Sequence, residues 1–167
     1  GSYGRATSIR CLAKLGVGTG FVGAVGDDED GRMLLRDFEG IGIDTSRIKV
    51  KTEAKTGSVI CLSDRQGRRS LYVSPGANDL VGKDDMDLDY VNQAHILHLS
   101  SFVHKQQLEL QKQRAESLAP SVKLSLAPGA IYAARGLKEL SPLLRKTHVL
   151  FTNEKELKQL TKEAITT

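Results

Sequence analysis

The sequence predicts an α/β protein with a doubly wound, mostly parallel sheet and a small β insertion. Three observations support this prediction. Short apolar stretches typical of buried strands alternate with stretches of helical periodicity along the 167 residues. Glycines and acidic residues mark the ends of the helical stretches. Between residues 48 and 73 the pattern changes to two strands joined by a tight turn, which indicates an inserted hairpin.

The first elements are a helix that ends on a glycine and a short strand. Apolar residues between 9 and 15 recur at helical spacing before Gly16. The apolar run at 20–25 then predicts a buried strand. The segment GVGTGFVG (16–23) contains the spelling G-x-G-x-x-G, but its glycines join a helix to a strand. A dinucleotide loop needs the reverse order, so these residues do not predict a dinucleotide cofactor.

A second helix and the hairpin follow. GDDEDG (26–31) places acidic residues at a helix start, and Leu34, Leu35 and Phe38 share one face of that helix. TGSVICLSD and RSLYVSP flank the turn RQGR, and together they predict a hairpin within a β region of about 46–75.

The remaining chain predicts parallel strands separated by helical stretches. The strands are AHILHLS, SVKLSLA and THVLFT; a polar helix follows the first, and a last helix starts at Asn153. Ligands of such sheets bind beyond the carboxyl ends of the strands. The loops at 100–104, 127–132 and 152–156 are therefore where chemistry is expected.

Composition excludes several other classes. The net charge is +4, but 24 Lys and Arg are interspersed with 20 Asp and Glu, which does not favour nucleic-acid binding. No run of about 18 apolar residues predicts a membrane helix, and the N-terminus lacks a signal-peptide pattern. We therefore expect a cytoplasmic, soluble protein. Cys11 and Cys61 lie among apolar residues without C-x-x-C spacing, which predicts buried free thiols.

Several stretches together resemble the ribokinase-like (pfkB) family of sugar and nucleoside kinases. Residues 12–48 are similar to that family's first helix, strand and second helix, PGAND (75–79) to the segment after its β lid, and AHILHLS to its next core strand. VLFTNEKELKQLT carries its N-x-x-E motif as Asn153 and Glu156. The resemblance implies that 1–167 form an incomplete, Rossmann-like α/β domain of truncated ribokinase-like fold, with a β lid at about 46–75.

The resemblance also implies a function. Members transfer the γ-phosphoryl group of ATP to a hydroxyl of a sugar or nucleoside, with Mg²⁺ as cofactor. Glu156 would act in the Mg²⁺ and phosphate region through a bound water, and Asn153 would orient that network. Thr7, Tyr72 and Asn78 would contact the substrate, although Thr7 stands where the family has Asn and would hold a sugar less well.

Asn153 and Glu156 also have a purely structural interpretation. Asn at a helix N-cap with Glu three residues later is a variant of the capping box, which stabilises a helix start in any protein. Both interpretations can hold at once.

Some features of the family are missing. The family's catalytic Asp lies in a segment of the form G-A-G-D, and the printed sequence contains none; it also begins after the family's first strand, and Ala127 replaces an Asp or Asn. We therefore expect no catalytic residue on this chain and no tight binding of ATP or Mg²⁺ by the chain alone. A completing C-terminal chain or a homo-oligomer is the expected partner. The alternatives are a non-catalytic remnant that binds sugar or dimerises, and a nucleotide-binding fold of unrelated chemistry.

Overall fold

The computed structural model describes residues 2–161 and, apart from residues 2–6 and 69, their side chains. The chain forms two compact units, Gly1–Met86 (unit 1) and Asp87–Thr167 (unit 2). Among the described residues, no helix combines the length and apolar character needed to cross a membrane.

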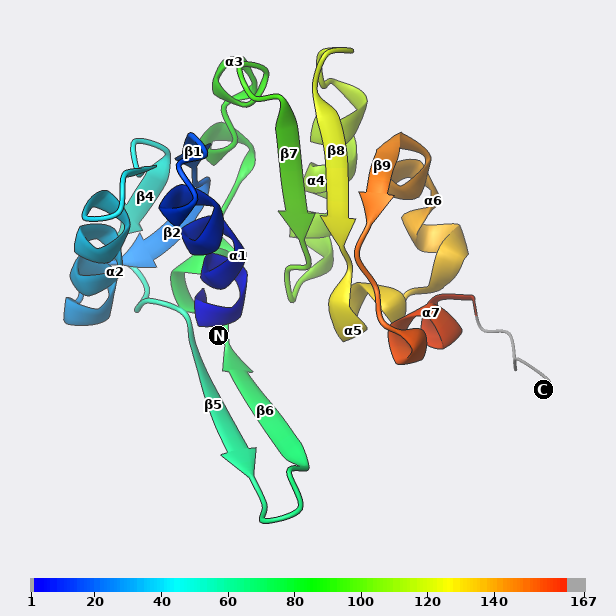
Figure 1. Cartoon of the computed structure of the whole chain (residues 1–167), viewed down its shortest axis with the longest axis horizontal. Coiled ribbons are helices and arrows are strands. Elements are labelled where there is room, and N and C mark those ends of the chain that lie inside the picture. The colour runs from blue at the N-terminus through cyan, green and yellow to red at the C-terminus, as the bar shows by residue number, and fades with distance from the viewer. Residues whose placement is uncertain (1, 162–167) are drawn as a thin grey trace. The chain divides into compact units, whose positions relative to one another are not determined.

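Unit 1 consists of short parallel strands, helices and a hairpin (Figure 1). Its elements are α1 (Ser2–Lys14), β1 (Thr19–Gly20), β2 (Gly23–Gly26), α2 (Glu29–Glu39), β3 (Ile43–Asp44), β4 (Ile48–Lys51), β5 (Ser58–Ser63), β6 (Arg69–Ser74) and two 3₁₀ helices, η1 (Gly76–Leu80) and η2 (Lys83–Asp85). Strand β1 pairs with β3 and β2 pairs with β4, both in parallel.

The single strand predicted at 20–25 is two strands in the structure. The strand is interrupted at Phe21 and Val22, which belong to neither strand. The strands on either side, β1 and β2, pair with different partners. At the break, the ring of Phe21 meets the ring of Phe38 edge-on, with centroids 5.4 Å apart. Packing of this side chain against the core of unit 1 accompanies the loss of strand regularity.

The ends of α1 and α2 follow the predicted signals. The chain leaves α1 through Gly16, whose φ of 81° lies in the left-handed region that glycine adopts without strain. Asp28 is the N-cap of α2, and Leu34 and Phe38 on that helix are buried against Val25. The acidic residues therefore lie at the start of α2, and its apolar face packs against the core, as predicted.

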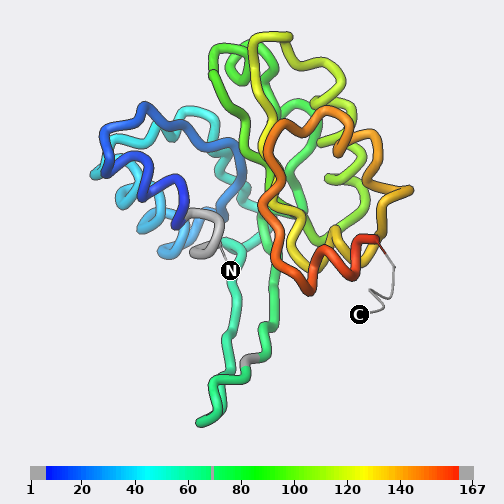
Figure 2. The backbone as a smooth tube through the Cα atoms, turned by 45° about the vertical axis from the view of Figure 1, so that its right-hand side comes forward, coloured from blue at the N-terminus to red at the C-terminus, as the bar shows by residue number. Residues whose placement is uncertain are grey.

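The predicted hairpin is present. Strands β5 and β6 pair antiparallel, and their turn passes through Gly67 at a φ of 78°. The hairpin extends as a long arm beyond the rest of unit 1 (Figures 1 and 2). Apolar side chains on both of its faces are exposed, namely Ile60, Leu62, Leu71, Tyr72 and Val73.

Unit 2 is a parallel sheet with helices. Its elements are α3 (Leu88–Val91), β7 (Ile96–Ser100), α4 (Lys105–Glu116), β8 (Lys123–Ala127), α5 (Gly129–Ala133), α6 (Gly136–Lys146), β9 (Thr147–Leu150) and α7 (Glu154–Thr161). The strands pair in the order β7-β8-β9, all parallel, as the alternation of strands and helices predicts.

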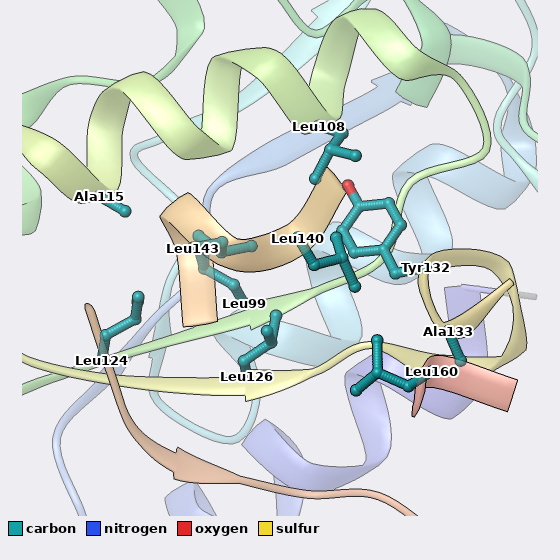
Figure 3. Close-up of a cluster of buried hydrophobic side chains, with 10 residues drawn as sticks. All are labelled: Leu99, Leu108, Ala115, Leu124, Leu126, Tyr132, Ala133, Leu140, Leu143 and Leu160. Carbon is teal, nitrogen blue, oxygen red and sulfur yellow. The ribbon is translucent and has the colours of Figure 1, made fainter. Parts of the chain in front are cut away.

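One face of this sheet forms the core of unit 2. Because side chains alternate along a strand, Leu99, Leu124 and Leu126 point to the same face and pack against leucines of α4 and α6. Figure 3 shows these side chains in one cluster together with Tyr132, which is fully buried. The residues of the cluster are Leu99, Leu108, Ala115, Leu124, Leu126, Tyr132, Ala133, Leu140, Leu143 and Leu160.

The opposite face of the same sheet carries exposed apolar groups. Ile96, Val149 and Phe151 are 61%, 50% and 58% exposed. Parallel sheets are ordinarily covered on both faces, so this face is suited to be covered by further protein.

The prediction of buried cysteines is wrong, since both thiols are free and exposed. Cys61 lies on the hairpin, where neither face is covered, and Cys11 is an exposed position of α1. Apolar neighbours in the sequence do not bury a residue when its element lies at the surface.

Candidate functional site

The carboxyl ends of β7, β8 and β9 lie at one edge of the unit 2 sheet. Ser100 pairs with Ala127, and Leu126 pairs with Leu150 on the third strand. The arrowheads of all three strands point the same way in Figure 1. The loops at 100–104, 127–132 and 152–156, in which chemistry was expected, therefore start from this edge.

Asn153 and Glu156 contact each other directly. The Glu156 backbone N–H donates to Asn153 Oδ1 at 2.8 Å, and the Asn153 backbone N–H donates to Glu156 Oε2 at 3.3 Å. These two bonds are the reciprocal pair of a capping box at the start of α7. The structural interpretation of this motif is confirmed.

The capping box leaves part of Glu156 available. Thr152 Oγ1 also donates to Glu156 Oε2, at 3.4 Å. Within the described part of the chain, Glu156 Oε1 takes part in no hydrogen bond. One carboxylate oxygen is therefore committed to the helix start, and the other can accept a hydrogen bond from water or a ligand.

Ala127 ends β8 at a sharp change of direction. Gly129 follows with a φ of 56°, and a Cβ added to it would lie 3.4 Å from Ser101 Oγ. The Ser101 side chain is thus brought from the end of β7 to the end of β8, where Ala127 itself offers only a methyl group. Ser101 is 8% exposed.

A buried polar chain, which the sequence did not reveal, supports the end of β7. Tyr132 Oη donates to Gln111 Oε1 at 2.9 Å, and Gln111 Nε2 donates to the Ser100 carbonyl oxygen at 3.0 Å. Gln111 is 2% exposed although α4 reads as a polar helix. These bonds fix the edge from which the loop at 100–104 starts, because a buried amide must keep its partners.

His98 and Ser125 lie on the exposed apolar face of the sheet. His98 Nδ1 lies 2.8 Å from Ser125 Oγ, and the imidazole meets the ring of Phe151 edge-on at 6.0 Å. Burial lowers the pKa of His98, which favours the neutral ring. This pair is part of the sheet surface rather than of the strand-end loops.

The three candidate substrate residues lie on separate elements of unit 1. Thr7 is an exposed position of α1, and Tyr72 lies on β6 with 61% of its surface exposed. Asn78 lies in η1 at the base of the hairpin, where its Nδ2 donates to the Pro75 carbonyl oxygen at 3.1 Å. Tyr72 and Asn78 thus belong to the hairpin and its base, as the lid hypothesis requires.

Comparison with known proteins gives consistent matches. A family model described as pfkB family carbohydrate kinase matches residues 4–167. An uncharacterized sugar kinase of Archaeoglobus fulgidus is 34% identical over 152 residues, which cover 91% of this chain and 60% of that protein. An ATP-dependent ribose-1-phosphate kinase of Halopiger xanaduensis is 28% identical over 160 residues, which cover 96% of this chain and 52% of that protein.

A solved structure agrees with these relatives. Arabidopsis thaliana ribokinase complexed with ribose and ATP matches with a TM-score of 0.75 and 25% identity, over 94% of this chain and 50% of that one. The chain therefore spans about half to three fifths of the length of these three proteins. The predicted fold, an α/β fold of ribokinase type of which one part is present, is confirmed.

Proposed function

The chain belongs to the pfkB family of carbohydrate kinases, and we propose that it is the N-terminal portion of an ATP-dependent sugar or nucleoside kinase. The full enzyme would transfer the γ-phosphoryl group of ATP to a hydroxyl of its substrate. The observation that carries this proposal is the family match over residues 4–167 combined with coverage of 60% and 52% of two kinase relatives.

The residues of unit 2 fit an indirect role toward Mg²⁺. The described residues contain no group of three or more His, Cys, Asp or Glu that could enclose a cation. Mg²⁺ keeps several waters and is commonly held by one or two carboxylates together with substrate phosphates. Glu156 Oε1 would accept a hydrogen bond from such a water, while Asn153 and Thr152 hold the carboxylate in place. Bound Mg²⁺ would neutralise phosphate charge during transfer.

The hairpin fits the role of a lid over the substrate. Tyr72 presents a large, exposed ring with a hydroxyl at its tip, and Asn78 lies at the hairpin base. Closing such an arm over a sugar would exclude water from the transfer step, which protects the phosphoryl group from hydrolysis. Thr7 would contribute a single hydroxyl to substrate binding.

No residue of this chain is assigned as the catalytic base. The sequence holds no G-A-G-D segment, and no glycine-rich loop of the described structure starts a helix of the kind that cradles phosphate. Residues 16–23 instead follow the end of α1, contain β1 and lead into β2. ATP binding and turnover would therefore require a completing chain or segment.

The proposal is tested by titration calorimetry and complementation. The purified chain is titrated with a panel of sugars and nucleosides and then with Mg-ATP, alone and after addition of a C-terminal fragment of a family kinase. We expect substrate binding by the chain alone, with turnover after complementation. Turnover by the chain alone would contradict the assignment of the base to another segment. The absence of substrate binding in both arrangements would contradict the kinase proposal.

A second candidate function is a non-catalytic module that binds sugar or dimerises. The observation that favours it is the amount of exposed apolar surface, on both faces of the hairpin and on the sheet face that carries Ile96, Val149 and Phe151. Surfaces of this kind commonly mark protein interfaces. Binding of sugar without turnover after complementation would support this alternative.

We also expect the chain to self-associate through the exposed sheet face. In sedimentation velocity, the unaltered chain should sediment as an oligomer, and Phe151→Ser should shift it toward the monomer because an exposed ring is removed. Lys155→Ser on α7 is the matched control and should leave the distribution unchanged. A monodisperse monomer for the unaltered chain would contradict this expectation.

A further inference from the structure

The base of the hairpin is a region of close backbone packing within unit 1. A Cβ added to Gly57, on the leg that enters β5, would clash with the Pro75 carbonyl oxygen on the leg that leaves β6. A Cβ added to Gly76 would clash with the Lys55 carbonyl oxygen, and the backbone there has a φ of 55°. Ala77 N–H donates to that same Lys55 oxygen at 2.8 Å. Both legs of the hairpin are therefore in direct contact where they join the unit.

Asp28 ties this base to the start of α2. Its Oδ1 accepts the Gly31 N–H at 2.9 Å, which is the ordinary N-cap bond. The same oxygen accepts the Thr56 hydroxyl at 2.6 Å, and Oδ2 accepts the Thr56 backbone N–H at 2.7 Å. Thr56 Oγ1 in turn accepts the Gly26 N–H at 2.9 Å, from the end of β2.

The arrangement exceeds what a helix cap needs. A cap requires one acceptor for the N–H groups of the first turn, and Gly31 supplies that donor. The two further bonds reach Thr56, which lies 28 residues away in sequence and two residues before the first residue of β5. The Thr56 hydroxyl, with the backbone N–H groups of Thr56 and Gly31, holds the pKa of Asp28 below its ordinary value. The carboxylate is thus kept in the ionised, acceptor-only form that all three donors require.

We propose that Asp28 is a positioning residue that sets the direction of the hairpin by clamping Thr56 to the start of α2. The inference rests on the proposed function of the hairpin as a lid, since a lid that reaches its substrate in one pose must be held at its base. Asp28 touches no substrate in this role. It acts through the leg that enters β5.

The test measures hairpin direction without any substrate. In a background of Cys11→Ser and Cys61→Ser, spin labels are attached at Gln66→Cys on the hairpin turn and Arg36→Cys on α2. Double electron–electron resonance then reports the distance between the turn and the helix. The unaltered network should give one narrow distance peak.

Four variants separate the clamp from general effects of mutation. Asp28→Asn should lose the narrow peak, because the side-chain NH₂ of asparagine would face the backbone N–H of Thr56, or one of the other donors, and two donors cannot form a hydrogen bond. Thr56→Val keeps the shape of the side chain, removes the hydroxyl and should have the same effect. Thr56→Ser retains the hydroxyl, so this variant should keep the narrow peak of the unaltered network. Asp27→Asn is the charge-matched control, since Asp27 pairs with Arg32 at the surface, and it should leave the peak unchanged.

Two results would overturn the proposal. One is a narrow peak retained in both Asp28→Asn and Thr56→Val. The other is a loss of helical circular dichroism signal together with a loss of amide-exchange protection in α2 and β2, in both variants. The network would then support the core of unit 1 and not the direction of the hairpin. Neither result depends on substrate binding, so failure of the clamp is distinguishable from failure of the kinase proposal.

Discussion

Replacing Leu126 with alanine should lower the free energy of unfolding of unit 2 by about 2–5 kcal/mol. Leu126 is fully buried on the middle strand of the sheet and packs in the cluster that contains Tyr132 (Figure 3). Truncation removes apolar contacts and leaves a cavity that the packed leucines on both sides cannot fill. The measurement is urea unfolding followed by circular dichroism.

The matched control for Leu126→Ala is Leu137→Ala. Leu137 lies on α6 and is 46% exposed, so its truncation should change stability by less than about 1 kcal/mol. Equal losses for the two variants would contradict the prediction that burial of Leu126 in the core causes the large loss.

Replacing Glu156 with glutamine should reduce kcat of the completed kinase by about 10-fold to 100-fold, the usual effect of changing a group that orients a metal's water shell. Glutamine still accepts a hydrogen bond from the Asn153 N–H, so the capping box is retained. Under the proposed function, the main effect of the lost charge is then on the phosphate region, since the hydrogen bonds of the cap are kept and the loss of a first-turn charge costs α7 no more than about 1 kcal/mol. The measurement is turnover of the complemented enzyme across a range of Mg²⁺ concentrations, together with the thermal midpoint.

Glu154→Gln is the control for this prediction. Glu154 lies on the same helical turn and forms an exposed ion pair with Lys158 at 2.7 Å. Its neutralisation should leave kcat unchanged, because surface ion pairs contribute little. If Glu156→Gln also left kcat and its Mg²⁺ dependence unchanged, Glu156 would be a helix cap without a role in catalysis.

Most of the element order could be predicted from the sequence because its signals are local. Gly16 after an apolar periodic stretch ends α1, and Asp28 with its acidic neighbours begins α2. Asn153 and Glu156 form the capping box that their spacing predicts. Each of these features depends on residues within one or two helical turns, so the printed order of residues is sufficient.

Contacts between distant segments could not be predicted in this way. The interruption of the strand at Phe21 accompanies packing of its ring against Phe38, and the exposure of Cys61 follows from the hairpin having no cover on either face. The site roles of Thr7, Tyr72 and Asn78 come from family resemblance and stay predictions. The structure adds the elements on which these residues lie.

The sequence by itself determined the fold class, the hairpin and the family, since periodicity, turn residues and motif spacing are properties of the chain order. Only the tertiary structure decided which polar groups work together. Asp28 reaches Thr56 across 28 residues, and Gln111 on a polar helix is buried against Tyr132. Both depend on where folding brings segments that are far apart in the chain, and burial then commits each polar group to the partner it meets there.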